Sequence, residues 1–174
     1  MEFVPSFGLL LQGLAVAMTT PTFESFVTIL TGWGFAPRRT VTRMILAAGD
    51  AARKHYSSYH RVFNAARWSR DALGLAVFRL IEPFCDSQIL VGIDDTLARK
   101  RGLKIFGVSM HHDPLLSSRG KKIMNGGHSW VVLGVIVELP FRPGHYFCLP
   151  ILFRLYLSKK KAAKHRRAYR TRPE

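Results

Sequence analysis

Two adjacent carboxylates, Asp94 and Asp95, follow a short apolar run at residues 89–93 and precede three basic residues at 99–101. The run is rich in β-branched residues and predicts a buried strand that ends at the two acids. Neighbouring side chains on a strand point to opposite faces, so at most one acid belongs to a given site. A carboxylate beside cations is suited to hold Mg²⁺ against phosphate oxygens. The alternative is an acid that forms a turn and pairs with a nearby arginine.

A second group of candidate ligands is formed by His111, His112 and Asp113, with His128 further along the chain. Histidine and aspartate bind transition metals. The first three residues are contiguous, however, and lack the one-turn spacing that aligns ligands on one face. We therefore expect no zinc site. We expect His111, His112 and Asp113 to form a loop on the substrate side, or Asp113 to cap a turn before Pro114.

The balance of charge indicates a polyanionic partner. The chain carries 26 Lys+Arg against 11 Asp+Glu, a net charge of +15. Nucleic acid is the commonest partner of so basic a protein, and an RNA- or ribosome-associated protein is a lesser alternative. Basic residues gather at 38–70 and 154–172, with smaller groups between them. The residues we expect to contact DNA are Arg38, Arg39, Arg43, Arg99, Lys100, Arg101, Lys121 and Lys122.

Composition excludes several classes of protein. With 174 residues of which 48% are hydrophobic, the chain suits a folded domain and not a disordered or collagen-like one. Its two cysteines, Cys85 and Cys148, are far apart and fit a reducing cytoplasm. The apolar run at 7–18 is shorter than the roughly 20 residues of a membrane-spanning helix, and no basic residue precedes it as in a signal peptide. We expect a cytoplasmic protein without a membrane partner.

The first half of the chain has helical periodicity. Thr22 predicts the start of one helix, and Gly32 with Gly34 its end. The other expected helices begin at Thr40, at Ser57 or Ser58, and at Ser69; the second ends at Gly49 and the last before Pro83.

The second half changes to strand periodicity. Strands are expected at 89–93, 104–108, 129–138 and 146–153, the last interrupted by Pro150 at an edge or a bulge. The pattern predicts an α+β fold in which a helical region precedes a mainly antiparallel sheet.

Several separated motifs, in one order, are similar to those of a known family. Residues 90–102, His111-His112-Asp113-Pro114 and residues 127–134 resemble transposases of bacterial insertion sequences, which are DDE-superfamily endonucleases with an RNase H-like catalytic domain. The segments 38–42, 58–63 and 67–69 resemble the helical DNA-handling region of those enzymes. The resemblance covers almost the whole chain.

The resemblance implies a fold, a chemistry and a partner. Residues 1–86 would form the helical region, and residues 87–174 the first antiparallel strands of an incomplete RNase H-like domain. Such enzymes use two aspartates and a glutamate to hold two Mg²⁺ ions for DNA cleavage and strand transfer. The first of these acids maps to Asp95, with Asp94 as the second choice. The implied partner is the DNA of insertion-sequence ends, and intact transposase or a second copy is a further possibility.

The later acids of that pattern are missing. After Asp95 the chain offers only Asp113, Glu138 and Glu174, and none has the expected position. Residues 171–174 have the capping pattern of a helix that does not follow, although a frayed basic tail is equally compatible. We therefore expect a truncated transposase with little or no catalysis of its own and a tendency to aggregate through an unpaired strand edge. The alternative is a non-catalytic basic DNA-binding module, or an inhibitor of an intact transposase.

Overall fold

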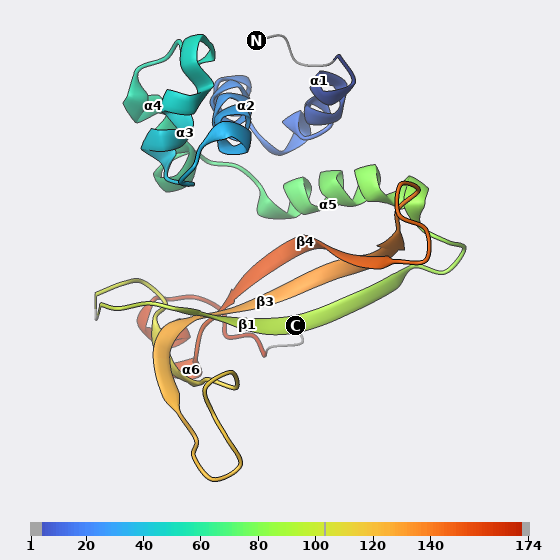
Figure 1. Cartoon of the computed structure of the whole chain (residues 1–174). Helices are drawn as coiled ribbons and strands as arrows, with labels where there is room; N and C mark the ends of the chain where they lie inside the picture. The colour runs from blue at the N-terminus through green and yellow to red at the C-terminus, as the bar shows by residue number, and fades with distance from the viewer. Residues whose placement is uncertain (1–4, 103, 172–174) are drawn as a thin grey trace. The chain divides into compact units, whose positions relative to one another are not determined.

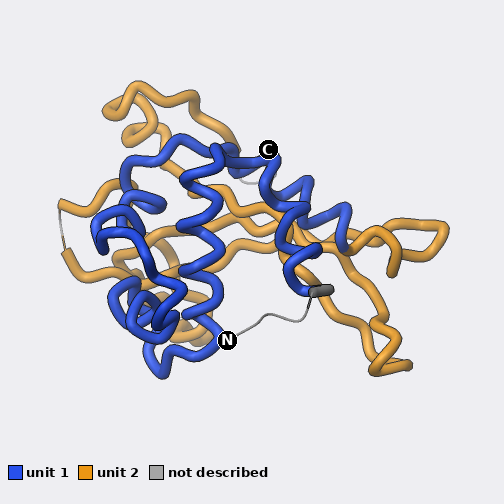
Figure 2. Tube along the Cα trace, turned by 90° about the horizontal axis from the view of Figure 1, so that it is seen from above, with its two compact units in different colours: residues 1–80 blue, residues 81–174 orange. Residues whose placement is uncertain are grey.

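The structure is a computed structural model that describes residues 5–102 and 104–171. The chain divides into two compact units, Met1–Leu80 and Ile81–Glu174, coloured separately in Figure 2. We call them the helical unit and the sheet unit. Helices followed by an antiparallel sheet confirm the expected α+β class, and the arrangement is consistent with part of an RNase H-like fold. The roles assigned to residues 1–86 and 87–174 remain predictions.

The amino-terminal half of the chain is helical (Figure 1). Its elements are α1 (Pro5–Gln12), η1 (Ala15–Ala17), α2 (Thr20–Phe35), α3 (Val41–Ala48), η2 (Gly49–Ala51), α4 (Tyr56–Asn64), α5 (Arg70–Ile81) and η3 (Glu82–Phe84).

Two of the expected helix caps are confirmed. The Thr40 side chain accepts a hydrogen bond from the Arg43 amide at 3.4 Å, which satisfies one free donor in the first turn of α3. The Ser69 hydroxyl accepts from the Ala72 amide at 3.0 Å at the start of α5. After α3 the chain turns at Gly49, whose φ of 55° lies in the left-handed region that favours glycine.

Two expected helix boundaries are wrong. Helix α2 begins at Thr20, with Thr19 at its N-cap, and continues through Gly32 and Gly34 to Phe35. Gly32 does not end the helix because it serves packing: a Cβ atom there would lie 1.8 Å from the Met44 carbonyl oxygen, so its absence lets α2 approach α3 closely.

The start of α4 also differs from the expectation. This helix begins at Tyr56, before Ser57 and Ser58, and His55 is its N-cap. The imidazole Nδ1 of His55 accepts the Ser57 amide at 3.4 Å, so a histidine provides the cap that we had assigned to a serine.

Two clusters of apolar side chains hold the helical unit together. One joins α2, α3 and α4 through Ile29, Ala36, Met44, Tyr59 and Val62. The other packs α5 against the amino-terminal helices through Leu11, Leu14 and Ala76. Within the apolar run at 7–18, Leu11, Leu14 and Ala17 are buried in this unit.

The sheet unit is built around one long central strand. The strands are β1 (Leu90–Arg99), β2 (Ser109–His112), β3 (Met124–Glu138) and β4 (Tyr146–Tyr156), followed by the short helix α6 (Lys159–Lys164). All pairings are antiparallel to β3: β1 lies along one edge, and β2 and β4 share the other (Figure 1). The expected interruption at Pro150 is confirmed as a shift in the register of β3 and β4. Leu133 pairs with Leu152 but the next residue, Gly134, pairs with Pro150, so the pairing skips Ile151.

Two strand predictions are wrong. Strand β1 does not end before the acids but continues to Arg99, because β3 starts early enough to pair with every residue from 90 to 99. It is also not a buried strand, since Leu90, Val91 and Ile93 are each more than half exposed. Residues 104–108 form turns, and Gly107 has a φ of 76°, so the second strand starts only at Ser109.

Two further points concern the membrane prediction and the end of the chain. In the described residues, no helix has the length and hydropathy needed to span a bilayer. The helix start predicted at 171–174 lies, except for Thr171, outside the described residues.

Candidate functional site

The two acids that the sequence singled out lie side by side in the middle of β1 and are both exposed. Asp94 pairs with Val132 and Asp95 with Val131 of β3. Because neighbours on a strand alternate, the two carboxylates point to opposite faces of the sheet. The carboxylate of Asp94 accepts the Asp95 amide at 2.8 Å. That of Asp95 accepts the hydroxyl of Ser129, a buried β3 residue, at 3.4 Å.

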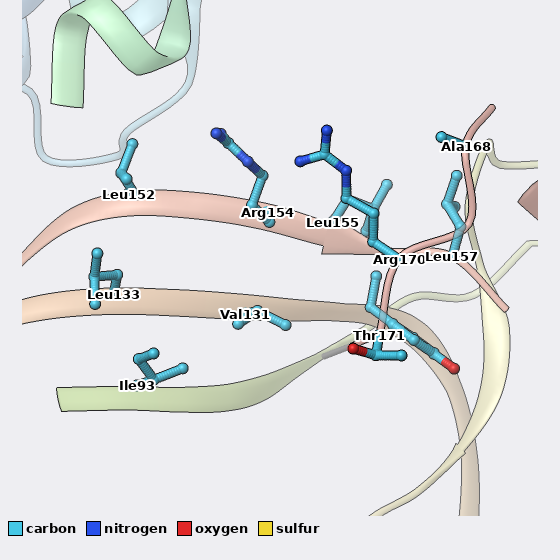
Figure 3. Close-up of a pocket in the computed structure, with 11 residues that line it drawn as sticks. Ile93, Val131, Leu133, Leu152, Arg154, Leu155, Leu157, Ala168, Arg170 and Thr171 are labelled. Carbon is cyan, nitrogen blue, oxygen red and sulfur yellow. The ribbon is translucent and has the colours of Figure 1, made fainter. Parts of the chain in front are cut away.

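The face that carries Asp95 also carries a mainly apolar cavity. We define the Asp95 face as the side bearing Ile93, Asp95, Val131, Leu133, Leu152 and Arg154, which share one face by alternation and register. A cavity of about 230 Å³ lies there, lined by aliphatic side chains and by Arg154, Tyr156, Arg170 and Thr171 (Figure 3). Asp95 and Arg154 are both cross-strand partners of Val131, so a cation stands in the same row as the acid.

Asp113 is the centre of a buried polar cluster. Its side chain is almost completely buried, and its Oδ2 accepts from Arg99 Nε at 2.6 Å and from Asn125 Nδ2 at 2.8 Å. Its Oδ1 accepts from the amides of Leu115 and Leu116 at 3.1 and 3.3 Å. These bonds confirm the prediction that Asp113 caps a turn before Pro114, and they join the end of β1 to the start of β3.

The hydrogen bonds to Asp113 also favour the charged form of its carboxyl group. The bond from Arg99, followed by that from Asn125, lowers the pKa of Asp113 to about 2, and burial opposes this shift only partly. The same hydrogen bond raises the pKa of Arg99. The arginine that the sequence placed beside Asp95 therefore makes its ion pair with Asp113, as a structural contact.

The expected loop at 111–113 is wrong for two of its three residues. His111 and His112 form the end of β2, because they pair with Asn125 and Met124 of β3. His111 is buried, and its ring lies 6.2 Å from that of Tyr156. His128 places Nε2 2.7 Å from the Phe106 carbonyl oxygen. Within residues 5–102 and 104–171, no three His, Cys, Asp or Glu side chains are grouped to hold a metal.

The predicted DNA-contacting cations are divided between the units. Arg38, Arg39 and Arg43 are exposed near the start of α3, where the Arg39 guanidinium lies 5.2 Å from the centre of the Trp33 ring. Lys100, Arg101, Lys121 and Lys122 are exposed in the sheet unit. Arg99 is the exception, because its guanidinium already binds Asp113.

Sequence reasoning missed Ser129 and Arg154 as residues of the Asp95 face, and Arg170 as a residue that lines its cavity. Alternation places Ser129 on the same face as Val131, but only the register between β1 and β3 places that face with Asp95. Arg154 needed the register between β3 and β4, which depends on the irregularity opposite Pro150. Arg170 lies on a segment without regular secondary structure, so no periodicity pointed to it.

Comparison with known proteins identifies the family. Residues 20–174 match the family model described as DDE superfamily endonuclease. No curated protein and no solved structure gave a significant match. The matched region includes α2 to α6 and every strand, with Asp95 on the first of them. The chain therefore belongs to the DDE superfamily of endonucleases.

Proposed function

We propose that this chain binds DNA and contributes Asp95 as the first carboxylate of a divalent-metal site for transposase-type DNA cleavage. The observation that carries the proposal is the position of Asp95: an exposed acid that accepts the Ser129 hydroxyl, on the face that also bears Arg154 and the cavity. Asp94 points to the opposite face and is the second choice. Membership of the superfamily favours a nuclease acting on DNA.

Magnesium is the ion that the family implies, and the described residues fit it only in part. Asp95 offers the hard oxygen ligand that Mg²⁺ prefers, but the described residues hold no group of three potential ligands. Two divalent ions close together need several carboxylates to offset their mutual repulsion. We therefore propose that this chain alone cleaves DNA little or not at all, and that further acids complete the site.

Metal binding and cleavage test these statements separately. Mn²⁺ binding, followed by electron paramagnetic resonance, is expected to weaken at least tenfold in Asp95→Asn and to change little in Asp94→Asn. Equal loss of Mn²⁺ binding in both variants would refute the assignment of Asp95.

Nicking of insertion-sequence end DNA in Mg²⁺ is expected to stay near background for the wild-type chain. Robust nicking that disappears in Asp95→Asn would overturn the catalytic incompleteness and make the chain an enzyme in its own right.

The second candidate function is a DNA-binding module without chemistry, able to inhibit an intact transposase. The net charge of +15 and the exposed arginines at 38, 39 and 43 favour it. A DNA-binding module of this kind would bind DNA tightly, with a strong salt dependence that Asp95→Asn does not change. What distinguishes it is that it would bind no metal at any concentration used for the cleavage assay.

A further inference from the structure

The segment after β4 is the most basic part of the sheet unit. We define the basic arm as residues 158–171, which include α6. It contains seven lysines and arginines, and no acidic residue occurs between positions 139 and 171. Six of the seven are exposed: Lys159, Lys160, Lys164, Arg166, Arg167 and Arg170. Within the described residues none of these six forms an ion pair. The arm therefore presents uncompensated positive charge.

The basic arm is packed against the sheet unit, so its cations have defined positions. Ala162 is only 1% exposed, and the His165 ring lies 4.6 Å from that of Phe106. After α6 the chain reverses direction at Arg166, whose φ is 52°, and the Arg167 amide donates to the Ala162 carbonyl at 2.9 Å. Because these contacts fix the backbone, binding a partner costs less conformational entropy than it would from a loose tail.

The end of the arm leads to the Asp95 face. Arg170 and Thr171 line the same cavity as Ile93 and Val131. In Figure 3 the guanidinium groups of Arg154 and Arg170 extend to the side of the sheet on which Leu152 lies. Asp95 and Arg154 flank Val131 on either side, two strand spacings or about 10 Å apart. That length corresponds to about three nucleotides along one strand of B-DNA.

We propose that the basic arm, together with Arg154, binds the phosphate backbone of the DNA strand that is presented to Asp95. The α6 lysines would contact phosphates away from the acid, and Arg170 and Arg154 those nearest to it. Tyr169, which is 44% exposed, adds an aromatic surface of the kind on which bases stack. This inference rests on the proposed function, and it adds a binding surface distinct from the arginines at 38, 39 and 43.

The test compares two variants that lose the same charge. Lys159→Gln/Lys160→Gln/Lys164→Gln removes three of the arm's seven positive charges, and Lys104→Gln/Arg119→Gln/Arg142→Gln removes three exposed cations elsewhere in the sheet unit. Binding of a labelled duplex and of a single strand is measured by fluorescence anisotropy at several salt concentrations in EDTA. The arm variant is expected to bind at least about tenfold more weakly at 0.1 M salt, with a log–log salt slope shallower by about 2–3. The matched variant is expected to change less than threefold.

Equal losses in the two variants would overturn the inference, because they would reflect net charge alone. An unchanged salt slope in the arm variant would overturn it as well. Circular dichroism and the thermal midpoint confirm that both variants are folded. Since binding is measured without metal, the result does not depend on cleavage: Asp95→Asn is expected to retain binding. If Asp95→Asn left Mn²⁺ binding unchanged while the arm variant lost DNA binding, the proposed function would be contradicted. The role of the basic arm in DNA binding would still be supported.

Discussion

The two units satisfy their buried polar side chains over different distances along the chain. In the helical unit, the hydroxyls of Ser25 and Thr31 donate to carbonyl oxygens four residues earlier, at 3.0 and 2.8 Å. In the sheet unit, the carboxylate of Asp113 accepts from Arg99 and Asn125, which are 14 and 12 residues away. The helical unit therefore needs only local geometry for the bonds that these hydroxyls donate, whereas the sheet unit needs three segments to assemble before its buried charge is paired.

We therefore expect the most sensitive position of the helical unit to be the close contact between two helices, and that of the sheet unit to be the buried charge cluster around Asp113. The comparison is sharpened by variants that act on one unit only. Hydrogen exchange measured peptide by peptide assigns each effect to its unit, because locally destabilised segments exchange faster.

The largest effect is expected for Gly32→Ala in the helical unit. The added methyl group would lie 1.8 Å from the Met44 carbonyl oxygen, a backbone atom that moves only if α3 moves. We expect a loss of about 3 kcal/mol or more in the free energy of unfolding. Gly34→Ala is the matched control, since nothing lies within 4 Å of its added atom. It should stabilise α2 by about 0.5 kcal/mol. Similar stabilities for the two variants would contradict the close approach of α2 and α3.

The next largest effect is expected at Asp113 in the sheet unit. Asp113→Ala removes the acceptor of two side-chain and two amide donors and leaves Arg99 without its acid. We expect the thermal midpoint of this unit to fall by on the order of 10 °C. Asp86→Asn, at an exposed acid of the same unit, is the control and should change it little. Faster exchange should appear in β2 and the start of β3, with α2 and α3 unaffected.

The same cluster gives a dependence on pH. The pKa of Asp113 is about 2 in the folded chain, below the value of about 3.9 for an unfolded aspartate. The stabilisation by the charged carboxylate is therefore complete above about pH 4 and is lost as the pH falls towards 2. Asp113→Asn removes this titration, so the difference in free energy of unfolding between wild type and variant should shrink as the pH falls from 4 towards 2. If that difference stayed constant from pH 5 to pH 2, the low pKa of Asp113 would be contradicted.

Features that depend on residues close together in the sequence could be predicted, and features that depend on distant residues could not. Caps and core faces of the helices depend on residues three or four positions apart, and the caps at Thr40 and Ser69 were predicted correctly. The end of α2 was not, because the role of Gly32 depends on Met44 of another helix. In the sheet, the existence of strands and the bulge at Pro150 were predictable. The extent of β1, the partner of Arg99 and the proximity of Arg154 to Asp95 depend on register, which single-residue patterns do not contain.

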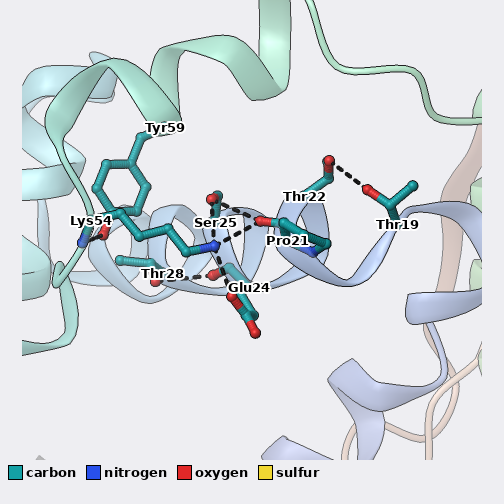
Figure 4. A network of polar contacts seen from close by, with 8 residues as sticks. All are labelled: Thr19, Pro21, Thr22, Glu24, Ser25, Thr28, Lys54 and Tyr59. Carbon is teal, nitrogen blue, oxygen red and sulfur yellow. Dashed lines mark hydrogen bonds and ion pairs between the residues drawn. The ribbon is translucent and has the colours of Figure 1, made fainter.

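A smaller effect is expected from the hydroxyl of Tyr59 in the helical unit. Tyr59 is buried, and its hydroxyl accepts the Lys54 amide at 3.0 Å (Figure 4). Tyr59→Phe leaves that amide without its acceptor and should cost about 1 kcal/mol in chemical denaturation. Tyr56→Phe, at an exposed tyrosine of the same helix, is the control and should cost nothing measurable. If Tyr59→Phe and Tyr56→Phe changed the free energy of unfolding equally, water would be accepting the hydrogen bond from the Lys54 amide in the variant.

The smallest effect is expected at the ion pair between Lys54 and Glu24, whose charged atoms are 2.7 Å apart on the surface of the helical unit (Figure 4). The side chains of Lys54 and Glu24 are 32% and 57% exposed, so solvent screens their attraction. Lys54 Nζ also donates to the Pro21 carbonyl at 2.8 Å and to Ser25 Oγ at 3.3 Å, contacts that survive removal of the acid. Glu24→Gln should therefore lower the free energy of unfolding by less than about 0.5 kcal/mol, and the difference should vanish in 1 M salt. A loss comparable to that of Asp113→Ala would show that a charge pair also governs the helical unit, and the contrast between the two units would not hold.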